Sequence, residues 1–133
     1  MQVKILKEYL HNMLVLGKID KRDRYIHKDF VAETPVFNSK ISNEYHEKFT
    51  KLVVAVFEKI HLEYKACIQQ DNMVFMNYIF KGIHARDILK YRATNKACIF
   101  DIGVLVKFRN NQIIFEKTFF DMNNVINQLQ SDR

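Results

Sequence analysis

An α+β fold, in which helices come first and an antiparallel sheet follows, is predicted by three features of this sequence. Apolar residues recur at helical spacing over residues 3–16 and again over residues 49–60. From residue 61 onward the apolar period changes from 3.6 to 2 residues, which is the period of a strand with one buried face. Short polar turns separate the later segments, and this order is typical of helices packed on one face of a sheet.

The chain of 133 residues is long enough for one domain with a single core, and we take residues 1–133 as that domain. Its 48% hydrophobic and 27% charged residues are ordinary for a globular protein. No apolar run reaches the ~20 residues that a membrane helix needs, and Met1 is not followed by the pattern of a secretory signal. Cys67 and Cys98 lack metal-ligand spacing and are expected to be buried free thiols rather than a disulfide, which suits the cytoplasm.

The first helix is predicted over residues 3–16 and ends at Gly17. Residues 18–31 predict a short helix, capped by Asp20, and then a bend. Five basic residues lie between Lys18 and Lys28 and the net charge is +6, so this stretch suits either an anionic partner such as nucleic acid or a solvated helix face. The solvated face is favoured and nucleic acid is not expected, because acidic residues interrupt the run and no aromatic stacking platform accompanies it.

A second helix is predicted after a loop or short strand around Pro35, the only proline. Ser42 or Asn43 is its expected N-cap. One face of this helix is apolar and must lie against another element, for which a sheet is the obvious candidate. The apolar stripe consists of Phe49, Leu52, Val53, Val56, Phe57 and Ile60.

A four-stranded antiparallel meander is predicted for most of the remaining chain. Its strands cover residues 61–69, 73–84, 97–109 and 113–121, and a short helical turn over residues 123–130 follows. Polar turns at 70–72 and 110–111 join the first strand to the second and the third to the fourth, because Asn and Asp tolerate the positive φ that tight turns require. The connection around residues 81–96 protrudes as a loop held by the sheet, which is where functional residues are often found.

Three segments resemble, in the same order along the chain, the motifs of the SnoaL-like proteins, which are polyketide-cyclase-type members of the nuclear transport factor 2-like fold. The resemblance implies a cone-shaped α+β barrel, in which a bent antiparallel sheet packs on N-terminal helices as in cystatin-like folds. It also implies a cavity for a small, mostly apolar molecule, and a homodimer formed through the open face of the sheet. The segments are Tyr25–Val31, then Gly82–Leu89 with Ala93–Lys96 and Phe100, then Ile113-Ile114 with Asp121 and Gln128-Leu129.

The resemblance gives catalytic roles to two polar residues. Asp121 matches the acid–base aspartate of the cyclase members, and His84 matches a histidine that would assist it. An aldol-type ring closure removes a proton beside a carbonyl and returns one to the oxygen, and an apolar cavity raises the pKa of a carboxyl group toward useful values. Structural alternatives remain open, with Asp121 as the N-cap of the last helix and His84 as a strand-end histidine bonded to backbone. Glu116 and Lys117 stand where the family commonly has a His-Trp pair in the last strand.

Further residues are candidates for lining the cavity, with ordinary core packing, or a solvent-facing position for Asp101, as the alternative. They are Tyr9, Met13, Tyr45, Phe49, Tyr78, Asp101 and Phe119. Cofactors and metals are not expected, because the five histidines are scattered and the sequence has no phosphate-binding Gly-rich loop or nucleophile motif. The leading hypothesis is a cofactor-independent cyclase, isomerase or lyase acting on a small hydrophobic carbonyl compound. The alternative is a non-catalytic module of the same fold that binds a ligand or another protein.

Overall fold

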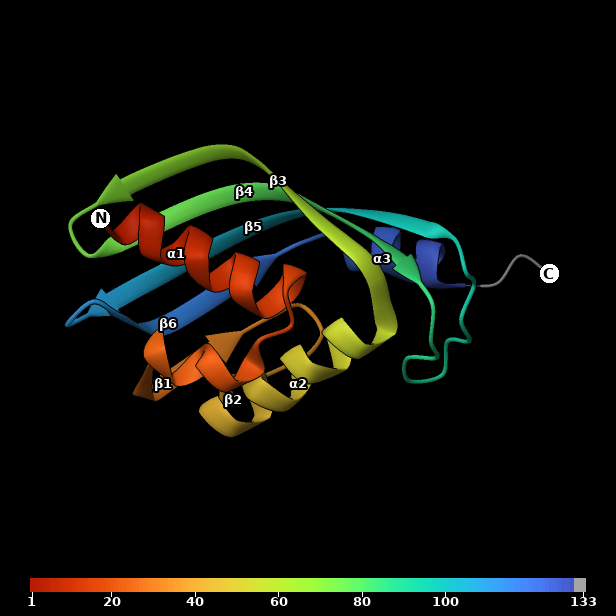
Figure 1. Ribbon diagram of the computed structural model, residues 1–133, viewed down its shortest axis with the longest axis horizontal. Coiled ribbons are helices and arrows are strands. Elements are labelled where there is room, and N and C mark those ends of the chain that lie inside the picture. The colour runs from red at the N-terminus through yellow and green to blue at the C-terminus, as the bar shows by residue number, and fades with distance from the viewer. Residues whose placement is uncertain (131–133) are drawn as a thin grey trace.

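The computed structural model describes residues 1–130. It is a curved six-stranded sheet with helices on its concave face (Figure 1). The helices are α1 (Gln2–Leu10), its π-helical continuation η1 (His11–Val15), the 3-10 helix η2 (Ile19–Arg24), α2 (Asn43–Val56) and α3 (Met122–Leu129). The strands are β1 (Ile26–Glu33), β2 (Ile41–Ser42), β3 (Phe57–Gln70), β4 (Met73–His84), β5 (Ala97–Arg109) and β6 (Gln112–Phe119). The predicted α+β class, with N-terminal helices packed on a bent sheet, is therefore confirmed.

The sheet is larger than the predicted four-stranded meander, and it is mixed. Its order is β2-β1-β6-β5-β4-β3, and β1 lies parallel to β6 while the other neighbours are antiparallel. The bend predicted after the short helix is wrong, because residues 26–33 form β1 instead. Three polar residues in a row, at positions 27–29, hide this strand from a reading of local apolar periodicity. One of its two partners, β6, lies more than 80 residues away in the sequence.

The first helical segment ends where the sequence predicts. Gly17 has a φ of +64°, a conformation that glycine adopts without steric cost, and it turns the chain from η1 into η2. Asp20 does not cap η2, because the cap position is Lys18 and no side chain accepts a hydrogen bond there.

The second helix begins as predicted but ends earlier. Ser42 is its N-cap, and the Ser42 hydroxyl accepts a hydrogen bond from the backbone N–H of Tyr45 at 3.1 Å. The helix stops at Val56, and β3 starts at the next residue, four positions before the predicted change of period. Lys59 has a φ of +55° beside an irregularity in the β3–β4 register, so the strand is bent soon after it starts.

Both predicted hairpin turns are confirmed. Asp71 joins β3 to β4 with a φ of +54°, and Asn110 and Asn111 join β5 to β6 with φ values of +51° and +63°. On β4 and β5 every second residue is buried beneath the helices, because successive side chains of a strand point to opposite faces of the sheet. The connection between these strands includes a short bridge between Ile88 and Tyr91.

A bulge in β6 decides which of its side chains face the helices. Ile113 pairs with Phe108, but Phe115 pairs with Lys107, so one extra residue, Ile114, stands in β6 between the two pairs. Such an insertion reverses the faces of all the residues that follow. As a result Glu116 and Thr118 point to the concave side, where both line a cavity.

Candidate functional site

A cavity of about 210 Å³ lies between the concave face of the sheet and the helices. Its walls come from α1, η1, α2, α3, five strands and the connections at residues 34–36 and 88–91, so nearly every element contributes to it. The lining is mostly apolar, and most ligand sites have this character, with a few polar groups fixing orientation.

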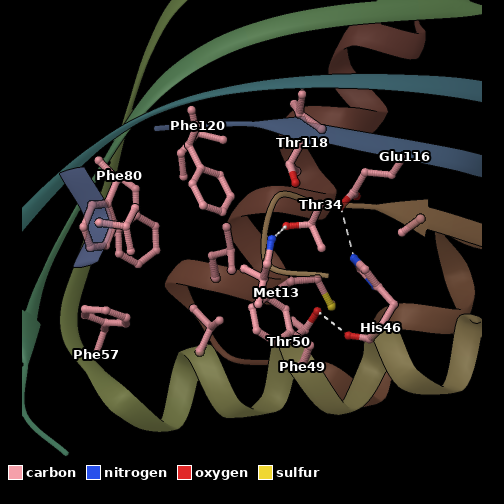
Figure 2. A pocket seen from close by; sticks show the side chains of 18 of the residues that line it. Met13, Thr34, His46, Phe49, Thr50, Phe57, Phe80, Glu116, Thr118 and Phe120 are labelled. Atoms are coloured by element: carbon pink, nitrogen blue, oxygen red, sulfur yellow. Dashed lines mark hydrogen bonds and ion pairs between the residues drawn. The ribbon is translucent and has the colours of Figure 1, made fainter. Parts of the chain in front are cut away.

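A polar cluster and a pair of phenylalanines lie at opposite ends of the cavity (Figure 2). At one end His46, Glu116, Thr34 and Thr118 are close together, and at the other end Phe57 and Phe80 face the space. The Phe57 ring packs edge-on against Phe80 and Phe100, with centroids 5.4 and 5.8 Å away. A ligand that fills this cavity therefore meets an aromatic end for its body and a polar end for its head group.

Glu116 and His46 form a buried pair at the polar end. The Nε2 atom of His46 lies 3.1 Å from Oε2 of Glu116, and both residues are 7% exposed. Helix α2 presents His46 on the same face as Thr50, whose hydroxyl donates to the His46 carbonyl oxygen at 3.0 Å. The Phe30 ring packs edge-on against the imidazole, with a centroid distance of 4.9 Å.

Arg22 completes this buried network behind His46. Its Nη2 atom lies 2.9 Å from Nδ1 of His46, and the residue is 2% exposed. The guanidinium also donates to the side chain and carbonyl oxygens of Asn43, and it lies 3.9 Å from a carboxylate oxygen of Glu47. Because a guanidinium only donates hydrogen bonds, Nδ1 of His46 must accept, so Nε2 carries the proton and donates to Glu116.

Two buried tyrosines, Tyr9 and Tyr78, line the same cavity near the Glu116 carboxylate. Burial raises the pKa of each phenol, and the nearby charge of Glu116 raises both further. Both phenols therefore stay protonated at any physiological pH and remain hydrogen-bond donors. In the described part of the chain only Oε2 of Glu116 takes part in a hydrogen bond, which leaves Oε1 for a ligand.

The two residues to which the resemblance gives catalytic roles lie elsewhere. Asp121 is exposed and is the N-cap of α3, where its Oδ1 accepts hydrogen bonds from the backbone N–H groups of Asn123 and Asn124 at 2.9 and 3.3 Å. It does not line the cavity. Asp121 therefore has the N-cap position that was the structural alternative to a catalytic role.

His84 is fully buried but also lies outside the cavity lining. Its Nδ1 accepts a hydrogen bond from the backbone N–H of Thr94 at 3.3 Å and lies 3.2 Å from the Thr94 hydroxyl. Within residues 1–130 its Nε2 has no hydrogen-bond partner, and burial lowers the pKa of the imidazole. His84 thus links the end of β4 to Thr94, in the loop that follows this strand. The structure does not bring His84 together with Asp121.

Four of the seven predicted lining residues border the cavity, and three face outward. Tyr9, Met13, Phe49 and Tyr78 line it. Tyr45 is 52% exposed and packs on Phe37, Phe119 is 43% exposed and lies 6.4 Å from the Phe75 ring, and exposed Asp101 accepts a hydrogen bond from Asn77 at 2.6 Å. Phe119 faces outward because the bulge at Ile114 reverses the alternation of β6.

The sequence interpretation missed the roles of Arg22, His46 and Glu116. His46 precedes Phe49 by three residues and Val53 by seven, so the apolar stripe of α2 already included its position. Arg22 lies three residues from both Ile19 and Tyr25, which is one turn of a 3-10 helix in each direction. Glu116 had no such signal, because the alternation counted from Ile113 places it on the outer face.

Over residues 1–130, no three His, Cys, Asp or Glu side chains are grouped so as to hold a metal ion. In the same range, no helix combines the length and apolar character that a bilayer-spanning segment needs.

Comparison with solved structures shows the fold. A SnoaL-like protein from Jannaschia sp. CCS1 matches with a TM-score of 0.88 at 12% identity, over 99% of this chain and 93% of that one. A SnoaL-like polyketide cyclase from Agrobacterium tumefaciens matches with a TM-score of 0.77 at 11% identity, over 97% and 98%. An LEH-like epoxide hydrolase from M. tuberculosis matches with a TM-score of 0.72 at 14% identity, over 96% and 88%.

The sequence itself matches one family model over nearly its whole length. The model is that of the SnoaL-like polyketide cyclases, and it covers residues 4–129. No curated protein matches the sequence. The match also agrees with the resemblance noted in the three sequence segments and with the ketosteroid isomerase-like fold named for another structural neighbour. The chain belongs to the SnoaL-like polyketide cyclase family.

Proposed function

We propose that this protein binds a small hydrophobic carbonyl compound in its cavity and catalyses a cofactor-independent proton transfer on it, with Glu116 as the acid–base residue. The observation that carries the proposal is the placement of the Glu116 carboxylate. It stands at the polar end of an otherwise apolar cavity, with one oxygen held by His46 and two phenols nearby. Reactions of the cyclase, isomerase and lyase types share this proton-transfer step.

The chemistry follows from these groups. Oε1 of Glu116 takes a proton from the carbon beside the ligand's carbonyl, and the C–H electron pair moves into the C=C bond of an enolate. The negative charge develops on the former carbonyl oxygen, where Tyr9 or Tyr78 donates a hydrogen bond. Glu116 then returns the proton to carbon, or to a second site if the product is rearranged. A base placed this way and a protonated donor are the two parts that enolisation requires.

Deuterium exchange into 2-tetralone tests the proposal. This bicyclic ketone has acidic protons beside its carbonyl, and NMR follows their replacement by solvent deuterium without any knowledge of the natural substrate. We expect the wild-type protein to accelerate exchange over buffer, and Glu116→Gln to remove at least about 99% of the acceleration, because general base catalysis contributes ~10²–10⁴-fold. Glu8→Gln, which changes an exposed glutamate on α1, is the matched control.

The same assay decides between Glu116 and the residues assigned by resemblance. Asp121 and His84 remain predictions from that resemblance, and Asp121→Asn keeps an N-cap acceptor, so folding should be preserved. Exchange lost in Asp121→Asn but kept in Glu116→Gln would restore the aspartate as the acid–base residue. Binding of 2-tetralone without exchange would leave the alternative function, a ligand-binding module.

We also propose that two chains pair through the convex face of the sheet. The support is a set of large apolar side chains that the helices leave uncovered. Large exposed apolar patches are rare on monomeric proteins and often mark interaction surfaces. Among them are Ile68, Ile99 and Phe119, which are 67%, 52% and 43% exposed. Sedimentation equilibrium should give a dimer for the wild-type protein and a monomer for Phe119→Lys, and a wild-type monomer at high protein concentration would contradict the pairing.

The free cysteines fit a reducing compartment, and on that basis we propose the cytoplasm as the location. Cys98 is buried as expected, the expected burial of Cys67 is wrong because its side chain is exposed, and neither forms a disulfide.

A further inference from the structure

The direction of the hydrogen bonds in the buried network suggests which ligands the cavity selects. Arg22 donates to His46, and His46 in turn donates to Glu116, so the network runs from a guanidinium that only donates to a carboxylate that only accepts. The free oxygen of Glu116 is therefore an acceptor at the polar end of the cavity. A ligand group placed there is stabilised only if it donates a hydrogen bond.

The remaining charge on the cavity wall points the same way. Among the described residues that line the cavity, the only charged ones are Glu33 and Glu116. Glu33 forms ion pairs with Lys40 and Lys117, whose Nζ atoms lie 4.0 and 3.6 Å from its carboxylate oxygens. No lysine or arginine in this lining is available to a carboxylate or phosphate, so an anionic head group would meet Glu116 without compensation.

We propose that the cavity selects an apolar molecule whose head group donates a hydrogen bond to Glu116, and that Arg22 is the positioning residue that fixes this selectivity through the tautomer of His46. The inference rests on the proposed ligand site but not on the proposed proton transfer, and a carbonyl compound meets it when the molecule also carries a hydroxyl group. Arg22 holds Nδ1 of His46 as an acceptor, and this keeps the proton on Nε2. If the proton moved to Nδ1, Nε2 would become an acceptor facing a carboxylate, and the Glu116 side chain would have to turn away or take up a proton.

The surroundings of Arg22 explain why the guanidinium keeps its orientation. Asn43 accepts hydrogen bonds from both terminal nitrogens of Arg22, and the guanidinium carbon lies 5.5 Å from the centroid of the Phe30 ring. Donation from two nitrogens in a fixed fork distinguishes arginine from lysine, whose ammonium group is a rotating point charge. Arg24, on the same 3-10 helix, is exposed and makes none of these contacts among the described residues, so it is a natural control.

The first part of the test is the tautomer of His46, read from long-range ¹H–¹⁵N correlation spectra at neutral pH. The resonance is identified by its loss in His46→Asn. We expect the Nε2–H tautomer in the wild-type protein, in Arg24→Met and in Glu116→Gln, and a mixture or the Nδ1–H form in Arg22→Met. Since Arg22→Met removes a buried cation and can fail to fold, the wild-type and Glu116→Gln spectra decide in that case. An imidazolium or Nδ1–H form in the wild-type protein overturns the inference, and so does a tautomer that changes in Glu116→Gln.

The second part compares the binding of three probes that share one ring system, 2-naphthol, 2-methoxynaphthalene and 2-naphthoate. The first has a donor, the second lacks it, and the third is an anion. We expect 2-naphthol to bind at least about tenfold more tightly than 2-methoxynaphthalene, because its hydrogen bond is to a charged acceptor, and 2-naphthoate to bind most weakly. The preference should fall below about threefold in Arg22→Met and stay unchanged in Arg24→Met.

The results separate this inference from the proposed proton transfer. Equal binding of 2-naphthol and 2-methoxynaphthalene, or tightest binding of 2-naphthoate, overturns the selectivity even if 2-tetralone exchanges its protons. The expected preference with no exchange into 2-tetralone supports the inference and removes the enzyme.

Discussion

Replacing Arg22 by methionine should destabilise the protein far more than any change on the surface of the same helix. The guanidinium is 2% exposed, and it is the only cation that touches His46 among residues 1–130. Its loss leaves the Glu116 carboxylate, 7% exposed, with a neutral imidazole as its hydrogen-bond partner. Removal of one member of a buried charged network costs about 3–5 kcal/mol, which is a large part of the ~5–15 kcal/mol that holds a typical domain folded.

Urea denaturation followed by circular dichroism measures this cost. Arg24→Met, on an exposed position of η2, should change the unfolding free energy by no more than about 0.5 kcal/mol. The double variant Arg22→Met with Glu116→Gln removes both charges, and its loss should be smaller than the sum of the single losses by about 1–3 kcal/mol, since the residues share one network. A loss below about 1 kcal/mol in Arg22→Met, or strict additivity in the double variant, would show that Arg22 and Glu116 do not stabilise the protein as one buried network.

Three other predictions concern stability. Ser42→Ala removes the N-cap of α2 and should cost about 1 kcal/mol in urea denaturation, whereas Ser39→Ala, at an exposed loop position, should cost almost nothing; equal effects would contradict the cap. Asp121→Ala should likewise cost about 1 kcal/mol, and Asp121→Asn much less, because asparagine also caps helices. Burial lowers the pKa of His84 from its usual 6.5, so the unfolded chain takes up this proton before the folded one as the pH falls. The unfolding free energy should therefore decrease below about pH 6.5. The decrease should be shallower in His84→Gln, and identical pH profiles would count against the burial argument.

Much of the fold could be predicted from the sequence because its signals are local. The stripe of α2, the alternation of β4 and β5 and the turns at Asp71 and Asn110-Asn111 each depend on a few neighbouring residues. Strand β1 could not be found this way, because its pairing with β6 joins distant parts of the chain and its own pattern is interrupted by polar residues. The end of α2 was also placed too late, since Phe57 and Ile60 continue the helical spacing although they belong to β3.

The candidate site was predicted in part, for a related reason. Tyr9, Met13, Phe49 and Tyr78 lie on elements whose buried face could be read from periodicity, and they line the cavity. On β6 the bulge at Ile114 reverses the faces, so Phe119 was expected inside and Glu116 was not. Alternation carries no information about where an extra residue is inserted, because a bulge depends on the pairing of two strands. The buried partners of Glu116 could then be recognised only in three dimensions.

A crystal structure of the protein soaked with 2-naphthol would show both where a ligand lies in the cavity and what its head group contacts. We expect the naphthalene ring to lie between the polar end of the cavity and the end formed by Phe57 and Phe80, with the naphthol oxygen within about 2.5–3.0 Å of Oε1 of Glu116. We also expect His46 and Arg22 to keep their present contacts. Naphthol with its oxygen at the Phe57 and Phe80 end of the cavity, or bound beside Asp121 with the cavity empty, would contradict this binding mode.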